Sequence, residues 1–108
     1  MARAIRTADA ETIIKKLPPR TWDSTTAVAY EATQELVNDV IGCYVALLNR
    51  ERRRPRPAPE QIRHIREQIA ACDQAQRTLD PDDAAGIEAL RASYRPRLQQ
   101  LRAELSER

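Results

Sequence analysis

The spacing of apolar residues between positions 62 and 79 constrains the fold more than any other feature of this sequence. The side chains in this stripe are Ile62, Ile65, Ile69, Cys72, Gln76 and Leu79. Their steps alternate between three and four residues, which places them on one side of an α-helix. This is the heptad pattern of a coiled coil, interrupted once by a polar glutamine. The pattern predicts a helix over about 59–79 that packs against another helix.

A second stripe follows after a turn signal. It consists of Ile87, Leu90, Tyr94, Leu98, Leu101 and Leu105. Between the stripes, Asp80 is a suitable N-cap and Pro81 a suitable first helical residue. Folding the chain at this turn brings the stripes together and predicts an αα-hairpin over about 59–106. Pro96 should kink or interrupt its second helix. The expected hairpin core is Ile62, Ile65, Ile69, Cys72, Leu90, Tyr94, Leu98 and Leu101.

Two further helices are expected before this hairpin, a short one over about 8–17 and a long one over about 24–54. Pro18-Pro19 separates them, and prolines at 55, 57 and 59 end the long one. Aromatic residues make up 4% of the chain and phenylalanine is absent, so aliphatic side chains must form the core. We therefore predict an all-α fold for residues 1–108. It is a single antiparallel bundle of three long helices plus a short N-terminal helix.

The long helix predicts self-association. Between Val40 and Leu48, apolar side chains point all round the helix axis, and such a helix must be covered on every side. Because one short helix and one hairpin leave part of it uncovered, we expect a homodimer or a larger homo-oligomer. The expected interface residues are Val37, Ile41, Tyr44, Val45 and Leu48.

Positive charge is concentrated at one place in the chain. The net charge is +2, yet the segment 50–57 alone carries +4, because five arginines stand there against Glu51. These arginines are Arg50, Arg52, Arg53, Arg54 and Arg56. Cations at the end of a helix oppose its macrodipole, so the cluster has a structural reading. Its functional reading is contact with phosphates or with an acidic protein partner.

No catalytic, metal or cofactor site is predicted. His64 is the only histidine, so a zinc site or a catalytic triad cannot be assembled around it. Cys43 and Cys72 are expected at the same height in the bundle as free thiols. Asp80 and its two neighbouring aspartates lack the calcium-loop pattern. We therefore expect a protein that is not an enzyme and has no cofactor.

The remaining sequence features concern location and function. No apolar run is long enough to span a membrane, no secretory signal is present, and arginine greatly outnumbers lysine. A cytoplasmic bacterial protein is therefore expected. We predict a small helical protein-binding module that binds itself and another protein, as a scaffold or adaptor. The alternative is a nucleic-acid-associated helper or antitoxin-like regulator. Its five arginines would neutralise about five phosphates and give a log–log salt slope near −4 to −5.

Overall fold

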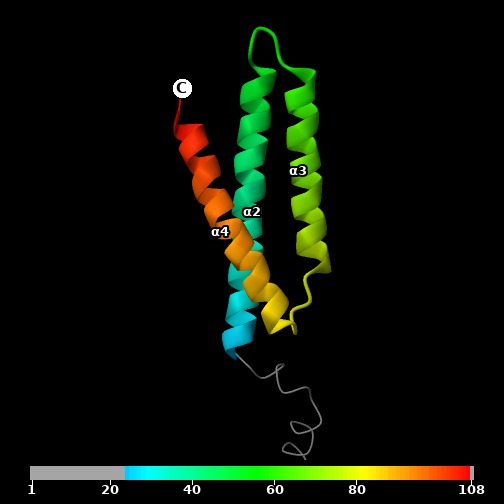
Figure 1. Cartoon of the computed structure of the whole chain (residues 1–108), viewed down its shortest axis with the longest axis vertical. Coiled ribbons are helices and arrows are strands. Elements are labelled where there is room, and N and C mark those ends of the chain that lie inside the picture. Colours follow the sequence, from blue (N-terminus) through cyan, green and yellow to red (C-terminus); the bar gives the residue numbers. More distant parts are fainter. Residues whose placement is uncertain (1–23, 108) are drawn as a thin grey trace, which may run out of the picture.

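The computed structural model describes residues 24–107. They form three α-helices, namely α2 (Ser24–Arg52), α3 (Pro59–Thr78) and α4 (Ala84–Ser106), and this part of the chain contains no strand (Figure 1). The prediction of an all-α fold with three long helices is confirmed for these residues. The short helix predicted over 8–17 lies outside the described residues.

Helix α2 is 29 residues long and ends two residues before the predicted boundary. Its last turn tightens, since the Arg54 N–H donates to the carbonyl of Glu51, three residues back, at 3.1 Å. Pro55 then offers no N–H with which the helix could continue. Gly42 lies in the middle of α2, and a Cβ added there would meet nothing within 4 Å. The glycine therefore does not serve a close helix approach within this chain.

The turn between α3 and α4 differs from the prediction. Asp80 is not the N-cap, because its carboxylate accepts the Asp82 N–H at 2.9 Å and its carbonyl accepts the Asp83 N–H at 3.0 Å. These bonds form a tight turn, and the carboxylate of Asp83 caps the helix by accepting the Gly86 N–H at 3.0 Å. Helix α4 therefore begins three residues after Pro81, the predicted first position.

Helix α4 continues without interruption through Pro96. Proline has no N–H, so the carbonyl of Ala92, four residues earlier, does not receive its usual helical hydrogen bond. Of the two effects expected of Pro96, a kink or an interruption of the helix, the interruption does not occur.

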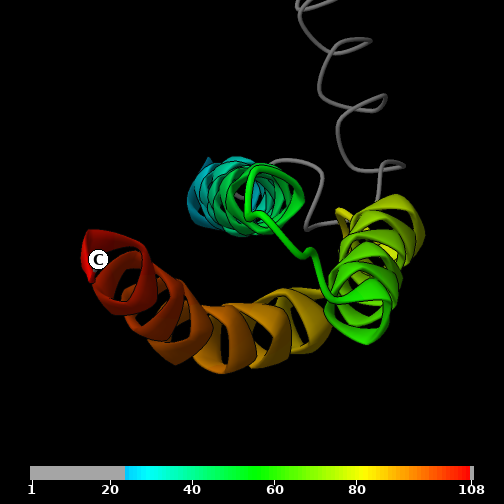
Figure 2. The ribbon, with the colours of Figure 1, turned by 90° about the horizontal axis from the view of Figure 1, so that it is seen from above.

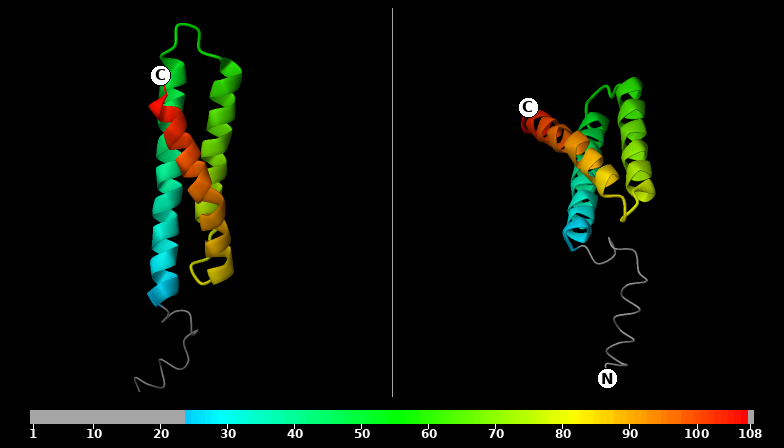
Figure 3. Two further views of the ribbon diagram at one scale, coloured as in Figure 1. Left: turned by 60° about the vertical axis from the view of Figure 1, so that its left-hand side comes forward. Right: turned by 60° about the horizontal axis from the view of Figure 1, so that its bottom comes forward.

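Helix α2 is the common element of the bundle. Both other helices pack along it, whereas α3 and α4 make few contacts with each other. The end of α3 and the start of α4 lie together at the 79–83 turn, and the two helices diverge with distance from it, as Figures 1, 2 and 3 show. The predicted pairing of α3 with α4 along a single seam is therefore wrong. Both apolar stripes face α2 instead, because its apolar surface is the widest of the three.

One core cluster joins the three helices. Its buried members are Val37, Val40, Tyr44, Leu47, Leu48, Ile65, Cys72, Tyr94, Leu98 and Leu101. The eight side chains expected in the hairpin core all lie in or against this cluster. Five of them are buried, and Ile62, Ile69 and Leu90 are half-buried.

The polar interruption of the heptad has a partner. The Gln76 side-chain amide donates to the carbonyl of Gln34 at 3.1 Å and to the Asn38 side-chain oxygen at 2.9 Å. Both acceptors lie on α2, so the Gln76 side chain binds α2 rather than the second helix of the predicted hairpin. A buried or half-buried amide needs such partners, and these two bonds fix the register of α3 on α2.

Candidate functional site

The five predicted arginines lie at the C-terminal end of α2 and in the turn that follows it, which is the green loop that joins α2 to α3 in Figure 1. Three prolines at alternating positions keep this turn extended and stiff. We call residues 50–58 the arginine end. The structure separates its five arginines into two that are engaged within the chain and three that are not.

Arg50 is one of the engaged arginines. Its guanidinium donates one hydrogen bond to the carbonyl of Glu104 at 3.2 Å and a second to the carbonyl of Leu105. These are among the last carbonyls of α4, which have no acceptor role inside the helix. Arg50 therefore holds the C-terminal end of α4 against the end of α2.

Glu51 organises the turn, and the sequence reasoning missed it. Its side chain is buried, with 6% of the residue exposed. Its carboxylate accepts the Ala58 N–H at 2.8 Å and a hydrogen bond from the Arg54 guanidinium at 3.1 Å. The Ala58 hydrogen bond, aided by Arg54, lowers the pKa of Glu51. Its position was the signal that could have identified it: Glu51 is the one acidic residue in a run of arginines, and a carboxylate surrounded by cations is expected to pair with one of them.

Three arginines of this end remain without a partner. Arg52, Arg53 and Arg56 are exposed, and none of their side chains forms a hydrogen bond or an ion pair with any described residue. Their charges are therefore available to a ligand or a partner. This reduces the predicted contact set from five arginines to three.

A groove lies beside the free Arg52, between the arginine end and the first half of α3. It has a volume of about 800 Å³. Its lining combines apolar and charged side chains, namely Arg52, Pro57, Pro59, Ile62, Arg63, Arg66, Glu67 and Ala70. We call it the Arg52 groove. Arg66 was not among the predicted site residues, because its distance of 14 residues from Arg52 in the sequence conceals their proximity.

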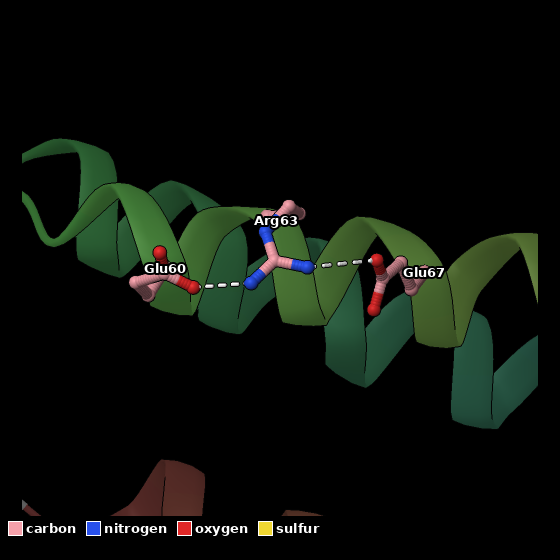
Figure 4. Close-up of polar contacts among 3 residues, drawn as sticks. All are labelled: Glu60, Arg63 and Glu67. Carbon is pink, nitrogen blue, oxygen red and sulfur yellow. Dashed lines mark hydrogen bonds and ion pairs between the residues drawn. The ribbon is translucent and has the colours of Figure 1, made fainter.

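The charges of the groove differ in how far they are compensated. Arg63 lies between Glu60 and Glu67 and is paired with both, as Figure 4 shows, with the Glu67 oxygen at 3.2 Å. Hydrogen bonding to Glu60 and the charge of Glu67 raise the pKa of this arginine. Arg66 is exposed and, within the described part of the chain, has no such partner. Arg52 and Arg66 therefore supply the free positive charge of the groove.

A second cavity of about 660 Å³ lies where the ends of the three helices meet. Leu47 and Ile65 are buried in its wall, and Arg50, Glu51, Arg54 and Glu104 contribute its charge. The side chains of Arg50, Glu51 and Arg54 already have partners within the chain, and Glu104 adds a negative charge. This cavity is therefore a less suitable binding site for an anion than the Arg52 groove.

The predicted oligomer interface is mostly inside the chain. Val37, Tyr44 and Leu48 are 0%, 9% and 8% exposed, because they face the core shared with α3 and α4. They are not available at the surface of the described structure. Ile41 is half-buried, and Val45 is 40% exposed. The apolar surface left uncovered on this part of α2 is therefore smaller than the sequence indicated.

A group of polar side chains lies within the core. Burial raises the pKa of Tyr94 to about 12, and hydrogen bonding to Cys72 adds to this effect. Burial also raises the pKa of Tyr44, while the nearby Arg97 lowers it. The Arg97 guanidinium lies 4.5 Å from the centre of the Tyr94 ring. These contacts link the three helices, and they pair Tyr94 with Cys72 rather than with Ile69, its expected neighbour.

The described residues contain no group of three or more histidine, cysteine or acidic side chains arranged to hold a metal ion. His64 is exposed on α3. Cys43 and Cys72 are free thiols, the first half-buried and the second buried.

Among the described helices, none is both long and apolar enough to cross a membrane. Neither a family model, nor a curated protein, nor a solved structure matches this chain.

Proposed function

We propose that this protein is a small helical protein-binding module that holds an acidic segment of a partner in the Arg52 groove. The observation that carries the proposal is the pair of unpartnered guanidinium groups, Arg52 and Arg66, on the lining of one apolar groove. Arginine pairs with carboxylates through two parallel hydrogen bonds, which gives both affinity and orientation.

The apolar part of the lining favours a protein segment as the ligand. Ile62 and Ala70 belong to α3, and Pro57 and Pro59 to the stiff turn. An apolar side chain of the partner would gain from burial against them, at about 25 cal/mol for each Å² removed from water. The prolines also keep this wall in place before binding, so little conformational entropy is lost on association.

The test is a titration with a labelled peptide in which acidic residues flank a leucine, followed by fluorescence anisotropy. We expect R52E and R66E each to weaken binding at least tenfold, because each replaces attraction by repulsion. The matched control is R95E, since the Arg95 side chain is exposed on α4 and forms no hydrogen bond or ion pair with any described residue. If R95E weakens binding as much as R66E, the groove is not the site.

Nucleic-acid binding is the second candidate, supported by the three free arginines of the arginine end. Because Arg50 and Arg54 are engaged within the chain, three phosphates are contacted by this end rather than five. The log–log salt slope then falls to about −3 per protomer. Gel retardation of a DNA and an RNA duplex at low salt tests this candidate. Absence of any retarded species at micromolar protein removes it.

A further inference from the structure

The two turns of the chain lie at opposite ends of α3 and carry opposite charge (Figure 1). Residues 53–58 contain three arginines and no acidic residue, whereas residues 79–83 contain three aspartates and no basic residue. We call the second segment the acidic turn. A helix of 20 residues separates the two turns by about 30 Å, so they cannot meet within one chain.

We propose that the Arg52 groove receives the acidic turn of a second copy of this chain. The copies would then associate head to tail. This inference rests on the proposed function, since it names the acidic segment that the groove holds. It keeps the predicted self-association but moves the interface from the face of α2 to the two ends of the bundle.

The acidic turn has the chemistry that the groove requires. It presents carboxylates beside the exposed Pro81 and the half-buried Leu79, which provide apolar surface next to the charge. The Asp80 carboxylate accepts the Asp82 N–H, and the Asp83 carboxylate accepts the Gly86 N–H. A carboxylate has about four acceptor positions, so capacity for an arginine remains. These bonds also hold the turn in one shape before binding, which limits the entropy lost on association.

The acidic side chains beside the groove should repel an incoming aspartate only weakly, because they are paired with Arg63. Glu67 lines the groove, and both Glu67 and Glu60 pair with Arg63 (Figure 4). An incoming aspartate therefore meets Arg52 and Arg66 unpaired and meets the two glutamates partly neutralised. The interaction is between exposed charges, so it should weaken as salt rises.

A head-to-tail contact uses different surfaces on the two copies. Such a heterologous interface leaves one groove and one acidic turn free at the ends of any open assembly. It therefore produces open chains, or rings where the ends meet, rather than a self-complementary dimer. An interface through the exposed Val45 face of α2 would be self-complementary and would stop at two copies. The two arrangements therefore differ in the distribution of mass that they produce.

Sedimentation velocity at low salt, over a range of protein concentrations, is the test. We expect wild type to form species larger than a dimer that dissociate at high salt, and R66E and D82R each to weaken association at least tenfold. D82N is measured beside D82R, so that removal of the charge is also tested without a bulkier side chain. V45E should leave association unchanged, because Val45 lines neither the Arg52 groove nor the acidic turn. Circular dichroism confirms that each variant is folded.

Mixing R66E with D82R gives the sharpest outcome. R66E keeps an intact acidic turn and D82R keeps an intact groove, so one productive contact remains and the mixture should form a two-chain complex. A wild type that stays monomeric at low salt overturns the inference. So does assembly that V45E abolishes and R66E does not. If the acidic peptide still binds to the monomer, the proposed function stands while this inference fails; if neither occurs, both fail.

Discussion

Replacing Arg50 with methionine separates the structural role of the arginine end from its binding role. Methionine keeps an unbranched apolar stem and a similar helix propensity, but it loses both hydrogen bonds to the last carbonyls of α4. A hydrogen bond from a charged donor contributes about 1.5 to 3 kcal/mol when it is well shielded. Because Arg50 is half-buried, we expect a total loss of about 2 kcal/mol. This corresponds to a decrease in Tm of about 10 °C.

The matched control is Arg53→Met, which removes the same charge from a residue without a partner in the described structure. We expect its free energy of unfolding to stay within about 0.5 kcal/mol of wild type. Urea denaturation followed by circular dichroism measures both variants, and hydrogen exchange should show faster opening of residues 101–106 in Arg50→Met alone. Equal stability of the two variants would refute the assignment of Arg50 to the end of α4.

Three further predictions concern the helices themselves. Thr33 is fully buried and its hydroxyl donates to the carbonyl of Ala29 at 2.7 Å, so Thr33→Val should change the free energy of unfolding by about 0.5 kcal/mol or less, whereas Thr33→Ala should cost about 1 to 2 kcal/mol. A Cβ at Gly86 would lie 2.9 Å from the Asp83 carboxyl carbon, so the methyl group of Gly86→Ala should displace the Asp83 cap and offset the gain in helix propensity. We expect this substitution to be near neutral in the wild-type background but to stabilise an Asp83→Ala background by about 1 kcal/mol, and thermal melts measure both. Because the Tyr94 pKa is raised to about 12, folding stability should fall as pH rises from about 10 to 12, and denaturant titrations should show a smaller decline in Tyr94→Phe.

The sequence predicted the helices better than their arrangement. Heptad spacing identifies α3 because period and side chain direction are local properties of a helix. It does not identify the helix that an apolar stripe faces. Ile65 and Tyr94 were both expected in the core of a hairpin between their two helices, yet α2 lies against both helices. The interruption at Gln76 was visible, but its partner on α2 depends on a register that only the assembled bundle defines.

The run of arginines was visible in the sequence, but which of them are engaged within the chain was not predictable. All five arginines are within eight residues, and nothing local distinguishes Arg50 from Arg52. Arg50 is engaged because the end of α4, more than fifty residues later, lies beside it. Arg66 joins the groove because the proline turn folds α3 back along α2. Both facts depend on contacts between segments far apart in the chain, which residue spacing does not record.

The central position of α2 also bears on how the molecule comes apart. Helix α3 is joined to α2 by a short turn, whereas α4 reaches α2 only through contacts between segments far apart in sequence, such as that of Arg50 with Glu104. Loop-closure entropy opposes distant contacts more than near ones. In partial unfolding, α4 should therefore detach first and leave the α2–α3 pair as a folding intermediate. That intermediate would uncover Tyr44, whose neighbours on α4 include Arg97, and transient aggregation during refolding would originate from this face of α2.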